Sequence, residues 1–229
     1  MKSLLKPMLM VLAHTLVLPA VLACHLLRQV TGSQTSVASW SQALSLFPGT
    51  GGVLLRQAFY SWTLAGCGKD ACVSLGTLFS HDNASVGATT YIGNYCSIGD
   101  VQIDDDVLIA SHVSIMNGTR QHGIGRLDVP VREQIGEYER ISIGRDTWIG
   151  ERATIAASVG RHCVIGAGAL VLEPIPDYSV AVGVPARVIK DRRQLASGTG
   201  GTRSSETRAA VGVPSTADDS AVTPSSVAH

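Results

Sequence analysis

An aliphatic residue recurs every six positions through most of the middle of the chain, and this period constrains the fold more than any other feature. A glycine usually follows the aliphatic residue, and a small or β-branched residue stands two positions before it. A period of six fits neither a helix nor a simple hairpin. It predicts short strands joined by tight turns, whose stacked coils share one continuous core. The aliphatic positions are Val86, Ile92, Ile98, Ile103, Ile109, Ile115, Ile143, Ile149, Ile155, Val159, Ile165 and Val171.

The composition suits thin, repeated layers. Only 5% of the 229 residues are aromatic and 24 are glycine. The formal net charge is zero, so no global field favours nucleic acid, and we expect no nucleic-acid partner. The five cysteines include no C-x-x-C pair, which argues against a disulfide scaffold. Cys96 and Cys163 fall two positions before an aliphatic residue, and we expect both to pack in the core.

Two steps of the repeat are short, 98 to 103 by one residue and 155 to 159 by two. The period is lost altogether only after Ile115, and it resumes at "ISIGRDTWIG". Residues 116–140 keep no phase and are predicted to form a loop excluded from the coils. This loop contains His122, in the stretch "TRQH". Inside the coils, the position three after the aliphatic residue favours residues that tolerate a positive φ. These turn residues are Asn83, Asp106, His112, Asp146, His162 and Gly168.

The segment that follows the break is "ISIGRDTWIGERATIAASVGRHCVIGAGALVLEPIPDYSVAVGVPARVIK", residues 141–190. It resembles the hexapeptide-repeat acyltransferases, and in particular is similar to the sugar O-acetyltransferases of polysaccharide biosynthesis, of the colanic acid and maltose acetyltransferase type. The resemblance covers about residues 75–190. It implies an all-β fold, a left-handed parallel β-helix, that assembles as a homotrimer and binds acetyl-CoA between subunits. It also implies a general base on the excluded loop, at His122.

The chemistry of acetyl transfer agrees with that role. When a hydroxyl attacks a thioester, its proton must be removed, and an imidazole with an ordinary pKa near 6.5 suits this task. The oxyanion then needs a donor, which a backbone N–H can supply. Direct transfer requires no Ser or Cys nucleophile. Within the same loop, Asn117, Arg120 and Gln121 are expected to contact the acceptor substrate.

Residues for the donor come from the second half of the repeat. Gly166, Ala167 and Gly168 leave a coil edge nearly bare for a pantetheine arm, although small residues also fit a turn. Trp148 would flank the acetyl-CoA or simply pack in an exposed position. The cations Arg187 and Lys190, on the strand that leaves the repeat, would meet its phosphates or form a solvated basic end.

A metal-based alternative is weaker. The γ-class carbonic anhydrases share this fold and bind zinc through histidines across a subunit interface. The paired H-x4-H spacing of that family is absent, because His112 and His122 are ten residues apart. We therefore expect no metal. The triplet 104–106 of aspartates is expected to be a polar turn, and Glu133, Glu137 or Glu139 could orient His122.

The flanks of the repeat differ in character. Residues 1–28 form a hydrophobic segment whose apolar part, 7–27, would span a membrane, bend back at Pro19, or be a signal peptide; we favour a retained anchor at the cytoplasmic face. Residues 29–74 are expected to be a connector with a short amphipathic helix at 51–64, which caps the coils or lies on the membrane. Residues 75–190 form the β-helix. Residues 191–229 are a basic exit and a tail predicted to be disordered from 197 onward.

Three functions compete. The first is acetyl-CoA-dependent O-acetylation of a sugar on a surface polysaccharide or a lipid-linked precursor. The second is N-acetylation of an amino sugar or amino acid. The third is a non-catalytic scaffold, which would need neither a histidine on an excluded loop nor a small-residue edge; the sequence has both.

Overall fold

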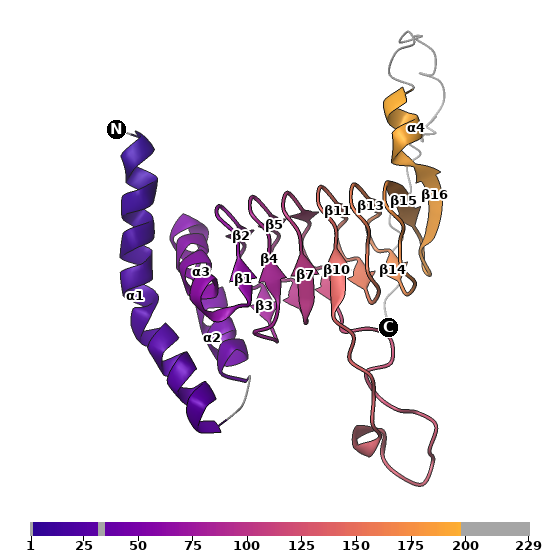
Figure 1. Ribbon diagram of the computed structural model, residues 1–229, viewed down its shortest axis with the longest axis horizontal. Helices are drawn as coiled ribbons and strands as arrows, with labels where there is room; N and C mark the ends of the chain where they lie inside the picture. The colour runs from indigo at the N-terminus through magenta and orange to yellow at the C-terminus, as the bar shows by residue number, and fades with distance from the viewer. Residues whose placement is uncertain (1, 32–34, 198–229) are drawn as a thin grey trace, which may run out of the picture.

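Short strands stack into a three-sided, left-handed parallel β-helix in the computed structural model, which describes residues 2–31 and 35–197 (Figure 1). Each of the first four coils contributes one strand to each side of this prism, and the later coils meet sheet A only through isolated bridges at Val159 and Ile175. Sheet A consists of β1 (Gly66–Cys67), β4 (Ser85–Val86), β7 (Val101–Ile103) and β10 (Ile141–Ile143). Sheet B consists of β2 (Cys72–Val73), β5 (Tyr91–Ile92), β8 (Leu108–Ile109), β11 (Trp148–Ile149), β13 (Val164–Ile165), β15 (Ser179–Val182) and β16 (Arg187–Asp191). Sheet C consists of β3 (Leu78–Phe79), β6 (Ser97–Ile98), β9 (Ser114–Ile115), β12 (Thr154–Ile155) and β14 (Leu170–Val171).

The hexad phase predicted from the sequence is confirmed by the packing. Every aliphatic position from Val86 to Val171 is buried and points into the prism, and the positions two before it are buried as well. The parallel register joins equivalent residues of successive coils, so that Ile109 pairs with both Ile92 and Ile149. Cys96 and Cys163 lie in the core as expected, and burial raises the pKa of each thiol. The coils begin at Gly66, ahead of the boundary expected at residue 75.

The corners between sheets hold the turn residues. Asp106, His112, Asp146, His162 and Gly168 all have a positive φ, as predicted. Asn83 does not, and that expectation was wrong. Other positive-φ residues occur where the residue type gives no warning, because the shape of the corner repeats from coil to coil whatever side chain it carries. These are Thr89, Tyr95, Arg152 and Tyr178, and Asp70 in the first coil has a positive φ as well.

Two helices close the first end of the prism. They are α2 (Thr35–Ser45), in a segment expected to be a connector, and α3 (Gly49–Thr63), the amphipathic helix expected there as a cap. Tyr60 of α3 packs on Phe79 of the first coil, with 4.8 Å between ring centroids, and its hydroxyl lies 2.8 Å from Ser41 Oγ. Burial raises the pKa of Tyr60 to about 12.

Arg56 locks this cap together. Its side chain is fully buried, and it donates to the carbonyl oxygens of Val73 at 2.9 Å, Leu44 at 3.0 Å and Phe47 at 2.8 Å. One guanidinium thus joins the end of α2, the turn into α3 and strand β2.

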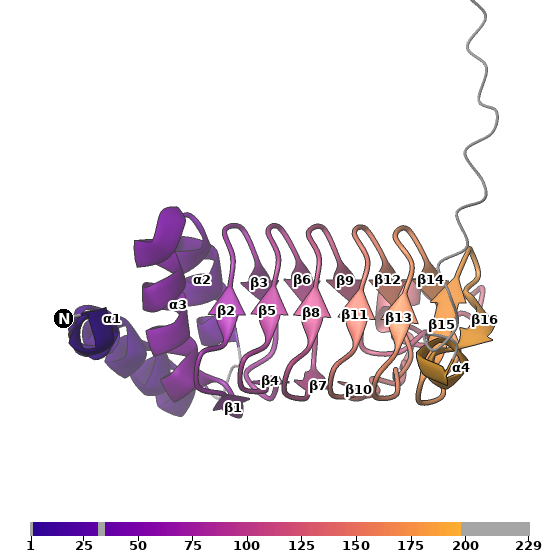
Figure 2. The same ribbon diagram turned by 90° about the horizontal axis from the view of Figure 1, so that it is seen from above.

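The long helix α1 (Lys2–Thr31) is outermost at the same end, with α3 between it and the coils (Figure 2). It passes through Pro19 as one helix, bent but not reversed, so the hairpin alternative is wrong (Figure 1). Within the described residues, Leu5–Thr31 is long and apolar enough to cross a membrane.

At the other end, β16 turns back antiparallel on β15 and leads into α4 (Arg192–Ser197). Apart from residue 197, the tail expected to be disordered lies outside the described residues.

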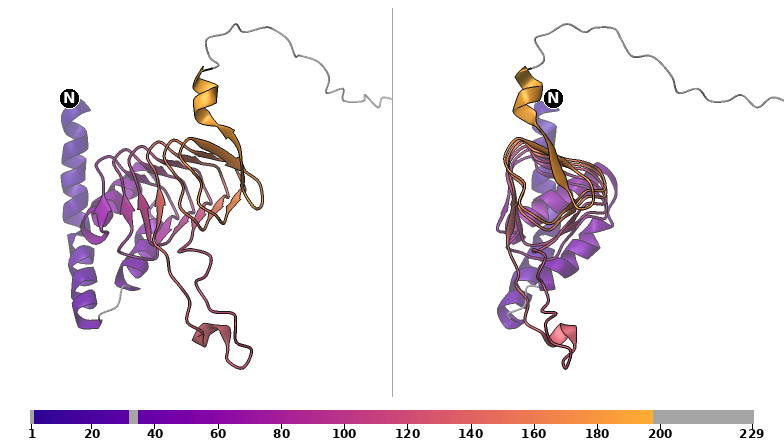
Figure 3. Two further views of the ribbon diagram at one scale, coloured as in Figure 1. Left: turned by 45° about the vertical axis from the view of Figure 1, so that its right-hand side comes forward. Right: turned by 90° about the vertical axis from the view of Figure 1, so that its right-hand side faces the viewer.

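Between β9 and β10 the chain leaves the prism. Residues 116–140, here called the arm, project away from the coils and carry one short 3-10 helix at Val131–Glu133 (Figure 3). The strands on either side continue the stack, so the loop predicted from the broken period is confirmed.

Candidate active site

The arm is a long hairpin whose two sides run close together near His122. The backbone N–H of Glu137 donates to Arg120 O at 2.7 Å, and that of Glu139 donates to Asn117 O at 3.1 Å. Gly136 crosses directly over the other side, where a side chain would meet the backbone of Gln121 and His122. His122 itself is exposed. The hairpin therefore fixes the backbone of His122 while it leaves the imidazole open to a ligand.

Charged side chains surround the base of the hairpin. Arg120 Nη2 lies 2.8 Å from Glu137 Oε2 and 3.6 Å from Glu139 Oε1. Gln121 Nε2 donates to Gly118 O at 3.2 Å. Of the three glutamates considered as partners for His122, Glu137 and Glu139 thus pair with Arg120 instead. The third, Glu133, has its Oε1 3.6 Å from Arg132 Nε.

Asn117 sits at the root of the arm rather than in open space. It is buried, and its Oδ1 accepts the backbone N–H of Asp100 at 3.0 Å. The same oxygen fills the space where Gly99 lacks a side chain. Asn117 therefore holds the arm to the preceding coil, a role that the sequence expectation of a substrate contact missed.

A hollow of about 390 Å³ opens beside this root. Arg120 and Glu139 form its arm side, and small residues of the next coils, Ala156 and Ala157, form its floor. These alanines could not be singled out from the sequence, because they lie between Ile155 and Val159, where the spacing of the repeat is only four residues. The complete lining is Thr119, Arg120, Glu139, Arg140, Ile141, Ala156, Ala157, Ser158, Leu172, Glu173 and Pro174.

The residues expected to hold the donor lie elsewhere on the same chain. The arm leaves from the corner between sheets C and A, whereas Gly166, Ala167 and Gly168 form a turn between sheets B and C. Trp148 is half exposed on sheet B, in register with Val164. Arg187 and Lys190 are exposed on β16, at the edge of sheet B. One chain thus does not bring the arm corner and the glycine-rich turn together.

The small residues of that turn have structural reasons of their own. Gly168 has φ of +67°, and a Cβ on Gly166 would meet Val182 Cγ1 at 2.8 Å. Ala167 is exposed, so the edge of the coil is indeed bare there.

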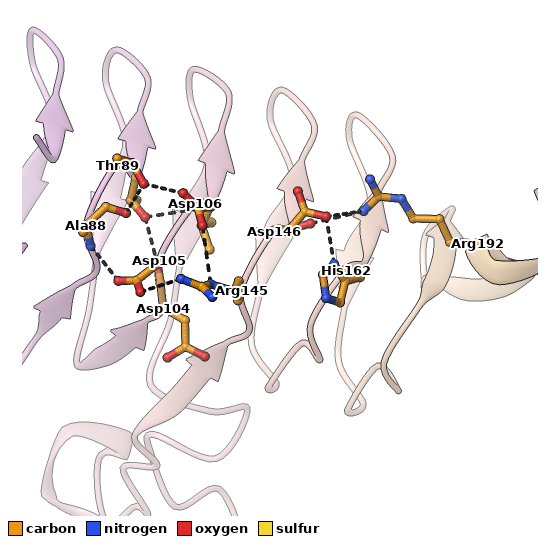
Figure 4. Close-up of polar contacts among 11 residues, drawn as sticks. Ala88, Thr89, Asp104, Asp105, Asp106, Arg145, Asp146, His162 and Arg192 are labelled. Carbon is orange, nitrogen blue, oxygen red and sulfur yellow. Dashed lines mark hydrogen bonds and ion pairs between the residues drawn. The ribbon is translucent and has the colours of Figure 1, made fainter. Parts of the chain in front are cut away.

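The other histidines of the repeat are engaged in the prism. His162 Nδ1 lies 2.8 Å from Asp146 Oδ2 (Figure 4). The His162 ring also stacks on Tyr178. His112 stacks on Tyr95, with ring centroids 5.5 Å apart. The aspartate triplet is a polar corner, where Arg145 pairs with Asp105 at 2.9 Å and Asp106 at 3.4 Å (Figure 4). Among the described residues, no group of three or more His, Cys, Asp or Glu is arranged to hold a metal ion.

Known proteins are similar to this chain in sequence and in architecture, although no family model matches it. Over 147 residues the chain is 33% identical to galactoside O-acetyltransferase of Escherichia coli K12, which covers 59% of this chain and 68% of that protein. Over 120 residues it is 36% identical to "Probable acetyltransferase Rv3034c" of Mycobacterium tuberculosis, which covers 52% of this chain but only 38% of the relative. A solved structure of galactoside acetyltransferase in complex with coenzyme A superposes with a TM-score of 0.61 at 26% identity, over 74% of this chain and 88% of that one. Because its sequence and its fold both match, the chain belongs to the hexapeptide-repeat acetyltransferases.

Proposed function

We propose that this protein transfers the acetyl group of acetyl-CoA to a sugar hydroxyl of a surface polysaccharide or its lipid-linked precursor, with His122 as general base. The observation that carries the proposal is the exposed side chain of His122 on a braced hairpin whose root, at Thr119 and Arg120, borders a polar hollow. A chain of this family that is similar to a galactoside O-acetyltransferase is expected to use a hydroxyl acceptor.

The reaction follows from the chemistry of the groups. His122 accepts the proton of the acceptor hydroxyl as its oxygen attacks the thioester carbonyl. The tetrahedral oxyanion is stabilised by a backbone N–H of a neighbouring coil. The C–S bond then breaks, and the imidazolium returns the proton to the CoA thiolate. Because both substrates are held at once, the protein forms no covalent intermediate.

The acceptor side of the site is assigned to the arm. Arg120 borders the hollow, and its pairing with two glutamates leaves carboxylate oxygens available to sugar hydroxyls. Gln121 lies next to His122 and would bind the same ligand. Asn117 contributes by fixing the arm root.

The donor is assigned to the face of a neighbouring copy. Since the arm and the turn at 166–168 occupy different corners, a second subunit is needed to join them, and a closed ring of three prisms does so. The arm also exposes large apolar side chains, including Ile124, Leu127 and Ile135, which suit contact with another subunit. In this assignment Trp148 and the bare edge at Ala167 flank the pantetheine, and Arg187 and Lys190 meet the phosphates. The protein works on the cytoplasmic side of a membrane, where acetyl-CoA is present.

The test is an acetyl transfer assay against a panel of glycosides, nucleotide sugars, lipid-linked sugars and amino sugars. Release of free CoA thiol is followed, and the product is then treated with mild base, which cleaves an acetyl ester but not an acetamide. We expect base-labile product that requires His122. A base-stable product would favour N-acetylation, and no thiol release with any acceptor would favour a scaffold.

A further inference from the structure

The outer face of α1 is apolar along its length. Its inner face packs on α3 through small residues such as Ala13, Val17 and Ala20. Residues 7–27 contain no Asp, Glu, Lys or Arg. At 100° per residue, the large exposed apolar side chains fall on the side of the helix opposite Ala13, Val17 and Ala20, which places them in one stripe. The exposed stripe consists of Leu5, Met8, Val11, Leu12, Leu16, Leu22, Leu26 and Val30.

Both ends of α1 are tied to the first coil of the prism. Lys6 Nζ lies 2.5 Å from Asp70 Oδ1, and Arg28 Nη1 lies 2.7 Å from Asp82 Oδ2, whose side chain is only 3% exposed. The helix between these ties is about 33 Å long at 1.5 Å per residue, close to the thickness of a bilayer's hydrocarbon core of about 30 Å. Asp70 and Asp82 belong to the same coil, so α1 runs across the prism axis rather than along it (Figure 1).

These ties decide how such a helix can meet a bilayer. If α1 spanned the bilayer, one of its ends would lie on the far side, and its acidic partner and the first coil would have to enter hydrocarbon. Burying those charged and polar groups is costly. We propose instead that α1 lies flat in one leaflet, parallel to the membrane surface, with the prism standing end-on above it.

Lipid suits this face better than a second helix does. The stripe is broad, from Val11 on one flank to Leu16 on the other, whereas a helix pair covers only a narrow seam. The hydroxyl of Thr15, inside the stripe, donates to Val11 O at 3.0 Å and needs no outside partner. Trp62 of α3 is exposed beside His14, with ring centroids 5.9 Å apart, where an interfacial tryptophan is favourable.

This orientation brings the arm near the membrane. Asp82, Asp100 and Asn117 occupy successive corners between sheets C and A. At about 4.8 Å per coil, the arm root stands roughly 10 Å above the first coil. A sugar on a lipid carrier could then reach His122. This consequence rests on the proposed function, whereas the membrane seating itself does not.

The test uses the full chain with extruded phosphatidylcholine vesicles, with and without phosphatidylglycerol, in a flotation gradient. We expect the wild type to float with both. Leu12→Glu with Leu22→Glu should lower the vesicle-bound fraction by roughly tenfold or more, because burial of each leucine is lost. The matched control places two glutamates at the far end, Val188→Glu with Ile189→Glu, and should float like the wild type. Circular dichroism checks folding, and Leu26→Glu replaces the double variant if that fails to fold.

Topology is read from an N-terminal tag on vesicle-bound protein. Externally added protease should remove the tag from intact vesicles, because α1 does not cross. A tag protected until detergent is added would overturn the proposal in favour of a spanning helix. Failure of the wild type to float would also overturn it, as would assembly beyond a trimer that the leucine variants dissolve, which would assign the stripe to a second copy. None of these readouts depends on acetyl transfer.

Discussion

Gly136 passes so close to Gln121 that a Cβ on the glycine would lie 2.0 Å from the Gln121 carbonyl oxygen and 2.6 Å from the amide nitrogen of His122. The two sides of the arm therefore fit together only when this position has no side chain. This contact sets where His122 stands.

We predict that Gly136→Ala lowers kcat while the prism stays folded. The added methyl group must push the two sides of the arm apart, and this displaces the histidine without touching the stacked coils. Steady-state kinetics and thermal unfolding would be compared with those of Gly125→Ala, whose Cβ would meet nothing within 4 Å. Equal kinetics for the two variants would contradict this view of the arm.

We predict that His122→Ala lowers kcat by roughly 10²–10⁴, the usual contribution of a positioned general base. Binding of CoA and folding should change little, because the residue is exposed outside the core. His112→Ala is the control. It should retain turnover per folded protein but lose about 1 kcal/mol of stability, because the stacking of its ring on Tyr95 is lost. If His112 rather than His122 proves essential, the general base is misassigned.

Lys190→Ala should raise KM for acetyl-CoA more than it lowers kcat. A phosphate contact far from the reacting carbonyl contributes equally to ground and transition states. The same substitution should weaken CoA binding measured by calorimetry. An unchanged affinity would leave Lys190 as part of a solvated basic end.

Asp146→Asn tests the pH dependence of stability. The hydrogen bond from His162, with Arg192 nearby, holds the pKa of the Asp146 carboxyl below its ordinary value. A depressed folded-state pKa contributes stability above the unfolded value of about 3.9, and this contribution is lost as pH falls through the folded value. The free energy of unfolding of the wild type should therefore exceed that of the variant at neutral pH, and the two values should converge in acid. The side chain is 48% exposed, so the difference should stay below about 1 kcal/mol. A gap that persists in acid would contradict the charge argument; asparagine also tolerates the positive φ.

Arg56→Lys should destabilise the cap by about 1–3 kcal/mol. Arg56 reaches Val73 O through Nε but Leu44 O and Phe47 O through Nη1, and the single ammonium nitrogen of a lysine cannot occupy both positions. Burial lowers the pKa of the Arg56 guanidinium, so the site already tolerates this charge at a cost. Arg126→Lys, at an exposed pair with Asp128, is the control and should change Tm little. A similar Tm for both variants would show that Arg56 does not hold α2, α3 and β2 together.

The prism could be predicted from the sequence because every coil has the same inward-facing positions as the next. Each inward position needs a residue of similar size, and the chain shows this directly in the series from Val86 to Val171. Positive φ was predicted at Asp106 because aspartate tolerates it, but missed at Tyr95, which adopts φ of +55° only because the stacked corner imposes it.

The helices at the first end and the candidate site were harder to predict, because they occur once and no repeat shows which residues they contact. Helix α2 reads as polar and small, and only its contact with α3 and the first coil makes it a helix. Asn117 carries a functional type of side chain, yet its burial against Gly99 depends on the coil beneath it. The sequence marks His122 only by its place in the segment that interrupts the six-residue period.

The arm also has an evolutionary consequence. Ile115 before it pairs with Ile155, and Ile141 after it pairs with Val101, as though no residues intervened. The two ends of the arm therefore leave and rejoin a stack that is complete without it. Descendants of this chain can lengthen, shorten or exchange the arm without refolding the coils. Under the proposed function, the acceptor would then diverge rapidly while the coils that bind the acetyl donor are inherited unchanged.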